Sequence, residues 1–193
     1  MTKTTIGLLR HGQTDWNVEF RLQGTADIPL NEVGIRQAHN AAKVLNRKDW
    51  DVLLTSPLSR AVDTAQIVAD SLGFDSIEIE DLLLERAFGE AEGMLHEQWQ
   101  EKYGHHTPAP GSESLEELAS RGWLLLERLV LLHPGKRILA VSHGAMIRKL
   151  LGLLSNGEIP PAGDRFQNLS LNVVSFDEEQ WRVEHYDPKT LGA

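Results

Sequence analysis

Short apolar runs that stop at polar turns mark the predicted strands of this chain. The first run, Ile6 to Leu9, ends at Arg10-His11-Gly12, which is typical of a buried strand that stops at a loop. The same pattern predicts strands over 51–55 and 137–142, and a weaker pattern predicts one over 77–79.

Longer stretches show apolar residues at helical spacing. They predict helices over 31–45, 57–72, 114–133 and 145–154. In the first of these, Asn31 is a suitable N-cap and Ile35 lies on the apolar stripe. Pro57 suits the first turn of the second helix. Ser114 opens the third helix with the form of a capping box, and Pro134-Gly135 closes it.

The remaining stretches are less regular. Residues 89–111 are rich in loop-forming residues and contain one short helical piece, in which Trp99 and Tyr103 share a face. We interpret that face as core packing in preference to a platform for a substrate. Residues 169–176 and 181–186 predict a hairpin that completes the sheet.

The alternation of strands and helices predicts the fold class. It favours an α/β three-layer α/β/α sandwich whose sheet is mostly parallel and has an antiparallel edge. The length of 193 residues fits a single domain over 1–193, because one hydrophobic core serves chains of up to roughly 250 residues. We see no linker and no repeat that would divide the chain.

Composition and charge restrict the function further. The chain has 41% hydrophobic residues and no apolar run near the ~20 residues that span a bilayer. Its first residues lack the features of a signal peptide. We therefore expect a cytoplasmic protein without a membrane partner. It has no cysteine, which excludes thiol nucleophiles and thiolate metal sites. The net charge of -9 argues against nucleic-acid binding. An anionic substrate must therefore be attracted by a local cluster of cations.

Candidate chemistry appears where two predicted strands end. Each of these strands is followed by a histidine and a glycine, at His11-Gly12 and at His143-Gly144. Ligands of open α/β sheets bind beyond the carboxyl ends of the strands, and neighbouring strands lie about 4.8 Å apart. If these two strands are neighbours, both imidazoles face one small site. The glycines allow close approach of the backbone, and the helix after Gly144 points N–H groups at an anion.

Two arginines fit the same site. Arg10 precedes His11, and Arg60 lies in the first turn of a predicted helix, off its apolar stripe. A guanidinium group stays charged and binds phosphate oxygens in bidentate fashion. The pattern therefore indicates a phosphate site.

These residues belong to a longer pattern. The string Arg10-His11-Gly12-Gln13-Thr14-Asp15-Trp16-Asn17 resembles the signature of the histidine phosphatase superfamily, which includes cofactor-dependent phosphoglycerate mutases. The resemblance continues, in order, over most of the chain, in Leu22-Gln23-Gly24, 29–34, 55–61, 84–89 with Glu92-Gly93, and 141–144.

The resemblance implies a phosphoglycerate mutase-like fold and a role for each matching residue. His11 would attack phosphorus and become phosphohistidine, and Glu85 would donate a proton to the leaving group. No metal or other cofactor is required, because arginines can supply the charge that magnesium supplies in kinases. The implied catalytic ligands of the phosphoryl oxygens are Arg10, Arg60 and His143, and the implied substrate-binding groups are Asn17, Gln23, Gly24 and Gly144.

Three functions fit these residues. We favour a phosphatase that hydrolyses small phosphorylated metabolites. A phosphoglycerate mutase is the alternative. In the mutases that this chain resembles, the segment after the donor glutamate reads Arg-His-Tyr-Gly and ends in Asn-Lys. This chain instead reads Arg86-Ala87-Phe88-Gly89 and has no Asn-Lys to bind a second phosphate. A non-catalytic phospholigand-binding module is the third, disfavoured because all five catalytic positions are present.

Other polar signals carry less weight. The stretch from His96 to Gln100 approaches the zinc-protease pattern but lacks its second histidine, so we read it as helix surface. His105-His106 is expected to be an exposed loop pair. Asn168-Leu169-Ser170 has the form of a glycosylation sequon, which has no meaning in a cytoplasmic chain.

Overall fold

A computed structural model describes residues 3–104 and 107–192 of the chain. Its strands are β1 (Thr4–Arg10), β2 (Val52–Thr55), β3 (Glu78–Ile79), β4 (Arg137–Ser142), β5 (Leu171–Asp177) and β6 (Gln180–His185). Its α-helices are α1 (Asp15–Val18), α2 (Glu32–Val44), α3 (Ser59–Leu72), α4 (His96–Tyr103), α5 (Leu115–Leu132) and α6 (Gly144–Leu154).

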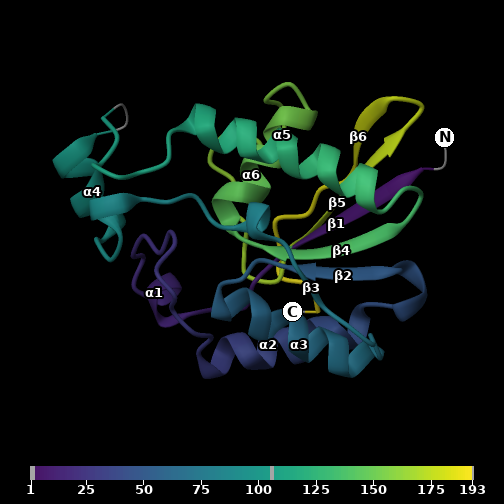
Figure 1. The fold of residues 1–193 in the computed structure, drawn as a ribbon. Helices are drawn as coiled ribbons and strands as arrows, with labels where there is room; N and C mark the ends of the chain where they lie inside the picture. Colours follow the sequence, from purple (N-terminus) through teal and green to yellow (C-terminus); the bar gives the residue numbers. More distant parts are fainter. Residues whose placement is uncertain (1–2, 105–106, 193) are drawn as a thin grey trace.

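The six strands form one sheet in the order β3-β2-β4-β1-β5-β6. The first four are parallel, whereas β5 runs antiparallel to β1 and β6 antiparallel to β5. Figure 1 shows α5 and α6 on one face of this sheet and α2 and α3 on the other. The predicted three-layer sandwich with an antiparallel edge is therefore confirmed.

Hydrophobic side chains fill both spaces between the sheet and the helices. Along β1, Ile6 and Leu8 point into the cluster beneath α5 and α6, while Leu9 points into the cluster over α2 and α3. A parallel strand that is covered on both faces reads as a continuous apolar run, because successive side chains point to opposite faces. This burial explains the uninterrupted run at 6–9.

Two local predictions are wrong. Pro57 lies outside α3, which begins at Ser59 with Leu58 as its N-cap residue. The Asp27 carboxylate accepts a hydrogen bond from the Ser59 backbone N–H at 2.7 Å, so a distant residue takes the place of a local cap. Ile35 is 41% exposed, since α2 faces the core with small residues: Gly34, Ala38, Ala41 and Ala42.

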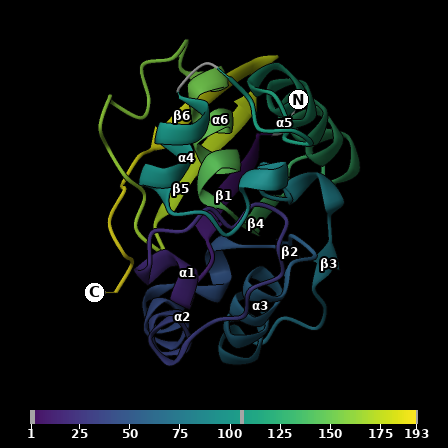
Figure 2. The same cartoon turned by 90° about the vertical axis from the view of Figure 1, so that its left-hand side faces the viewer.

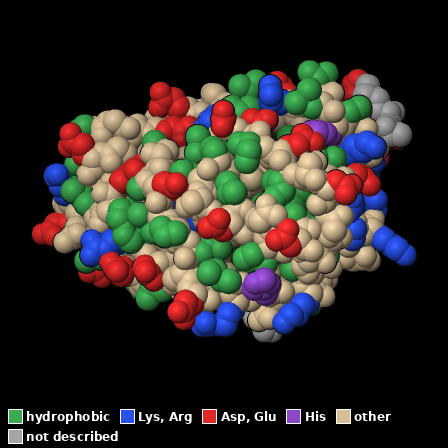
Figure 3. All heavy atoms as spheres, turned by 60° about the horizontal axis from the view of Figure 1, so that its bottom comes forward, with side chains coloured by type: hydrophobic (Ala, Val, Ile, Leu, Met, Phe, Trp, Pro, Cys, Tyr) green, Lys and Arg blue, Asp and Glu red, His purple; other side chains and the backbone are tan. Residues whose placement is uncertain are grey.

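The outer faces of the helices carry mixed side chains. Figure 3 views the molecule from the side of α2 and α3, where hydrophobic groups are interspersed with acidic and basic ones. Within residues 3–104 and 107–192, no helix is long and apolar enough to cross a bilayer.

Candidate active site

Two histidines meet at the carboxyl ends of adjacent strands. β1 and β4 are parallel neighbours in which Arg10 lies opposite Ser142, and the His11 backbone N–H donates to the Ser142 carbonyl at 3.0 Å. The imidazole rings of His11 and His143 therefore follow on neighbouring strands, with centroids 5.1 Å apart. Both side chains are buried, with exposed fractions of 2% and 0%. The predicted convergence of the two rings is confirmed.

The surroundings of His11 fix which ring nitrogen carries the proton. Nδ1 lies 2.6 Å from the Gly12 carbonyl oxygen, which only accepts, so Nδ1 must carry the hydrogen. The other nitrogen, Nε2, then has a lone pair. Burial, followed by the charges of Arg10 and Arg60, holds the pKa of His11 well below its usual 6.5. The ring is therefore neutral at neutral pH, with a lone pair on Nε2.

The ring of His143 is oriented by a serine. Its Nε2 lies 2.7 Å from the Ser56 hydroxyl oxygen, and its Nδ1 has no hydrogen-bond partner in the described structure. Burial holds the pKa of His143 well below 6.5 as well. If the Ser56 hydroxyl donates to Nε2, then Nδ1 is a buried donor that an incoming anion can satisfy.

Both predicted arginines are held by backbone carbonyls. Arg60 is fully buried and donates from Nη1 to Ala26 and from Nη2 to Gly24, each at 2.8 Å. Arg10 donates from Nη1 to the Phe166 carbonyl. Burial lowers the pKa of Arg10 to about 10, so the guanidinium keeps its charge at neutral pH. Burial likewise lowers the pKa of Arg60.

Unpartnered donors mark this cluster as an anion site. In the part of the chain that the structure describes, Nε of Arg10, Nε of Arg60 and Nδ1 of His143 are buried and have no hydrogen-bond partner. Buried polar atoms are nearly always paired, because an unpaired donor has lost its water without compensation. The two guanidinium Nε–H groups are donors in every state, and Nδ1 of His143 joins them when the Ser56 hydroxyl donates to Nε2, so the cluster fits a multidentate anion such as a phosphoryl group.

Two amide side chains present donors to the same region. The Asn17 Oδ1 accepts from the Thr14 backbone N–H at 3.1 Å, and the Gln23 Oε1 lies 2.9 Å from the Thr14 hydroxyl. Since both amide oxygens are engaged, the NH₂ groups of Asn17 and Gln23 are left for a ligand. Both residues line the cleft described below.

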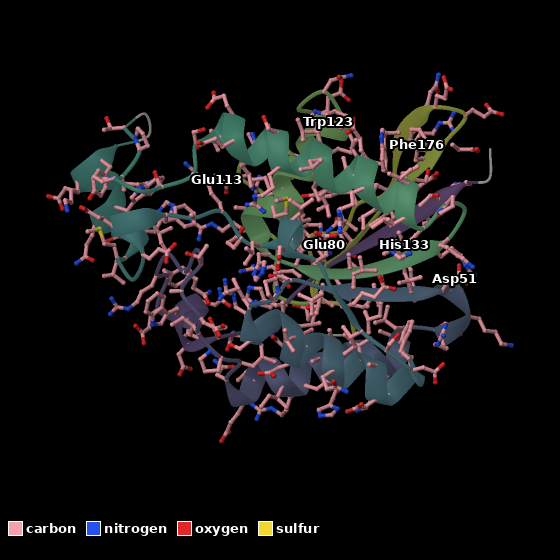
Figure 4. The ribbon with its side chains drawn as sticks, in the orientation of Figure 1. Asp51, Glu80, Glu113, Trp123, His133 and Phe176 are labelled. Carbon is pink, nitrogen blue, oxygen red and sulfur yellow. The ribbon has the colours of Figure 1, made fainter. Side chains whose placement is uncertain are left out.

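Glu85 lies at the N-terminus of α6. Its carboxylate accepts from the backbone N–H groups of Ala145 and Met146, both at 3.1 Å. The predicted helix terminus therefore contacts an anion, but this anion is the side chain of Glu85. Arg121 donates to the backbone oxygen of Glu85 at 3.2 Å and pairs with Glu113 at 2.8 Å; Figure 4 labels Glu113 where the chain enters α5.

A cleft of about 950 Å³ opens onto these groups. It lies at the end of the molecule where Figure 2 shows α1 and α4. The predicted site residues that line it are Arg10, His11, Asn17, Gln23, Gly24, Arg60, Glu85 and Gly144. His143 is fully buried and does not line the cleft, although its ring centroid lies 5.1 Å from that of His11. Trp99 also lines the cleft and is half-buried, so its interpretation as a core residue is wrong.

The sequence does not predict several residues of the site, because their contacts join segments that lie far apart in the sequence. Ser56 contacts His143, and the Thr64 hydroxyl accepts from the Gly12 backbone N–H at 3.0 Å. The Glu92 carboxylate accepts from the N–H groups of Thr25 and Ala26, which fixes the loop that holds Arg60. Local sequence gives no signal for such contacts, apart from the position of Ser56 and Glu92 within the quoted motifs.

No group of three or more histidine, aspartate or glutamate side chains within the described ranges is arranged to hold a metal ion. The His105-His106 pair lies outside the described residues.

The sequence and the fold of this chain are similar to those of known proteins. Residues 6–188 match the model of the histidine phosphatase superfamily (branch 1). The chain is 39% identical to "Uncharacterized phosphatase PhoE" of Bacillus subtilis (strain 168), over 95% of this chain and 94% of that protein. It is 32% identical to a metal-independent phosphoserine phosphatase of Arabidopsis thaliana, over 95% and 81%. A mycobacterial glucosyl-3-phosphoglycerate phosphatase, solved with VO3, superposes with a TM-score of 0.80 at 30% identity, over 93% and 96%.

Proposed function

Because the chain belongs to the histidine phosphatase superfamily (branch 1), we propose that it hydrolyses small phosphomonoesters through a phosphorylated His11. Relatives that carry the name of phosphatases support hydrolysis as the reaction class. The single observation that supports this mechanism best is the environment of His11: a neutral ring with a free Nε2 lone pair beside three buried nitrogen atoms that have no hydrogen-bond partner, on Arg10, Arg60 and His143.

In the first step, the Nε2 lone pair of His11 attacks phosphorus as the bond from phosphorus to the ester oxygen breaks. Arg10, Arg60 and His143 would bind the three equatorial oxygens, and their charges and N–H groups stabilise the transition state. Phosphoryl transfer depends mainly on positioning and on neutralising charge, and these are what fixed, buried guanidinium groups supply. The NH₂ groups of Asn17 and Gln23 and the backbone of Gly24 and Gly144 would complete the pocket.

Glu85 would move the protons. The leaving oxygen of an alkyl ester is a strong base, so it needs a proton as the bond breaks. Glu85 lines the same cleft as His11, and its protonated carboxyl group would give that proton to the leaving oxygen and become a carboxylate. In the second step, the Glu85 carboxylate takes a proton from water, and the water oxygen attacks phosphorus. The bond from phosphorus to Nε2 breaks, phosphate leaves, and both residues return to their starting states.

The proposal is tested by metal-free turnover. Purified protein in EDTA should hydrolyse p-nitrophenyl phosphate, and vanadate should inhibit it because vanadate adopts the five-coordinate geometry of the transition state. His11→Ala should abolish turnover. If the wild-type protein binds phosphate esters without cleaving them, it is a binding module and the proposal is wrong.

The mutase alternative is separated by one substrate. With 3-phosphoglycerate, a phosphatase releases inorganic phosphate, whereas a mutase forms 2-phosphoglycerate. The sequence Arg86-Ala87-Phe88-Gly89 departs from that of the family mutases, and we therefore expect phosphate release. A screen of phosphorylated metabolites, including sugar phosphates and nucleotides, would identify the preferred substrate.

A further inference from the structure

A tight turn places Asn168 opposite the nucleophile. The Ser170 backbone N–H donates to the Gln167 carbonyl at 3.2 Å, which closes a four-residue turn over 167–170. Within it, Leu169 is fully buried and has a φ of 58°, in the left-handed region that residues other than glycine rarely adopt. Such strained backbone persists only where the surroundings fix it, and it is common at functional sites.

The surroundings that fix this turn are the backbone groups of Arg10. The Leu169 N–H donates to the Arg10 carbonyl, and the Arg10 N–H donates to the Ser170 carbonyl, both at 3.1 Å. The turn is thus paired on both sides with the residue that precedes His11. This pairing brings the side chain of Asn168 against His11.

The amide of Asn168 makes two contacts inside the site. It is 8% exposed, and its Nδ2 donates to the His11 carbonyl at 2.9 Å and to the Asn17 Oδ1 at 3.1 Å. An amide nitrogen has two hydrogens, so one hydrogen serves each acceptor. The His11 contact holds the backbone beside the proposed nucleophile, and the Asn17 contact engages the Asn17 amide oxygen, which leaves the Asn17 NH₂ group for a ligand.

We propose that Asn168 is a positioning residue that holds the nucleophile and the phosphate-binding amide in one geometry. The inference rests on the proposed function, in which His11 and Asn17 act on the same phosphoryl group. A neutral amide suits this position because it supplies two donors without adding charge beside Arg10 and Arg60. The sequon form of 168–170 therefore corresponds to an internal structural role of Asn168.

A pair of matched variants tests this role. Asn168→Ala removes both donors, whereas Asn172→Ala removes another buried amide, whose Oδ1 accepts from the Asp187 N–H at 3.1 Å outside the site. Both variants should lower the melting temperature. Only Asn168→Ala should also lower kcat, by about 100-fold, because small displacements of reacting groups slow reactions by that order.

A double-mutant cycle adds a readout that a general loss of stability does not affect. Asn17→Ala and Asn168→Ala should each weaken vanadate binding, but in the Asn17→Ala background the further loss caused by Asn168→Ala should be several-fold smaller. Independent effects of the two variants on vanadate affinity would count against the coupling.

The outcomes separate the two proposals. If the wild-type protein does not hydrolyse phosphate esters, the proposed function fails. If the wild-type protein is active and Asn168→Ala matches Asn172→Ala in kcat, only the role of Asn168 is overturned. If Asn168→Ala does not fold, Asn168→Ser, whose hydroxyl has one hydrogen for two acceptors, is measured in the same way and must show the same loss of kcat.

Discussion

The Glu85 carboxylate oxygen Oε1 accepts a hydrogen bond, 3.1 Å long, from the backbone N–H of Ala145, the second residue after His143. This contact connects the proposed proton donor to the turn that begins α6, directly beyond the second strand end. Helix N-termini favour anions, because their N–H groups lack partners within the helix. The proposed proton donor therefore lies at the same carboxyl end of the sheet as the two histidines.

The donor role of Glu85 predicts a dependence on the leaving group. Glu85→Gln preserves the shape of the side chain but cannot donate an acidic proton. Esters of alkyl alcohols need that proton, whereas p-nitrophenolate leaves readily without it. We expect kcat/KM for alkyl phosphates to fall about 100-fold more than for p-nitrophenyl phosphate, within the range of general acid catalysis.

Glu97→Gln is the control for this prediction, because Glu97 is the other glutamate that lines the cleft. It should leave the ratio of the two kcat/KM values unchanged. Equal slowing of both ester types by Glu85→Gln would remove Glu85 from the donor role.

The glycines that follow the two histidines should differ in their tolerance of a side chain. A Cβ on Gly12 would lie 2.7 Å from the Gly34 carbonyl oxygen, whereas a Cβ on Gly144 would come no closer than 3.6 Å to Arg10. Gly12→Ala should lower the free energy of unfolding by about 1–3 kcal/mol, as overpacking of backbone does. Gly144→Ala should not lower it, since alanine is favoured over glycine in a helix.

Urea unfolding of both variants measures this difference. If Gly12→Ala proves as stable as the wild type, the close packing of the Gly12 backbone against Gly34 of α2 is not rigid. That result would also weaken the case for a fixed His11.

Stability should depend on pH through the buried histidines. Burial holds the pKa of His143 well below 6.5 in the folded chain, whereas the unfolded chain protonates near 6.5. Below pH 6.5 the unfolded state therefore binds more protons, and the free energy of unfolding falls as the pH falls. Each such histidine contributes a slope of up to about 1.4 kcal/mol per pH unit.

Unfolding of the wild type and of His143→Gln between pH 7 and pH 5 tests this slope. The stability of the wild type should decline more steeply than that of the variant. His39→Gln, which changes an exposed histidine, should run parallel to the wild type. Parallel curves for His143→Gln would show that the ring is not buried in its neutral form.

The parts of the fold that sequence predicted well are those with local signals. The strand that precedes His11 and the strand that precedes His143 are short apolar runs. Because both strands are buried on both faces, their side chains are apolar without interruption, and this pattern predicts a strand from the sequence alone. The juxtaposition of His11 and His143 followed from a general rule about where ligands bind in open sheets, applied to two similar strand ends.

The predictions that failed depend on contacts across the chain. The preference of Pro57 for a first helical turn is local and predicts a helix that includes it, whereas the start of α3 at Ser59 is capped by Asp27, which is far away in the sequence. The helical face of Trp99 predicts core packing, but Trp99 lines the cleft. Asn168 matched a motif unrelated to its contacts with His11 and Asn17.

The most direct test of the account is to trap the covalent intermediate. Enzyme mixed with a phosphomonoester and quenched in alkali, in which phosphohistidine survives, can be digested and sequenced by mass spectrometry. The account predicts one phosphoryl group on His11, absent from His11→Ala but present in His143→Ala at a lower yield. Phosphate on another residue, or rapid turnover by His11→Ala, would contradict it.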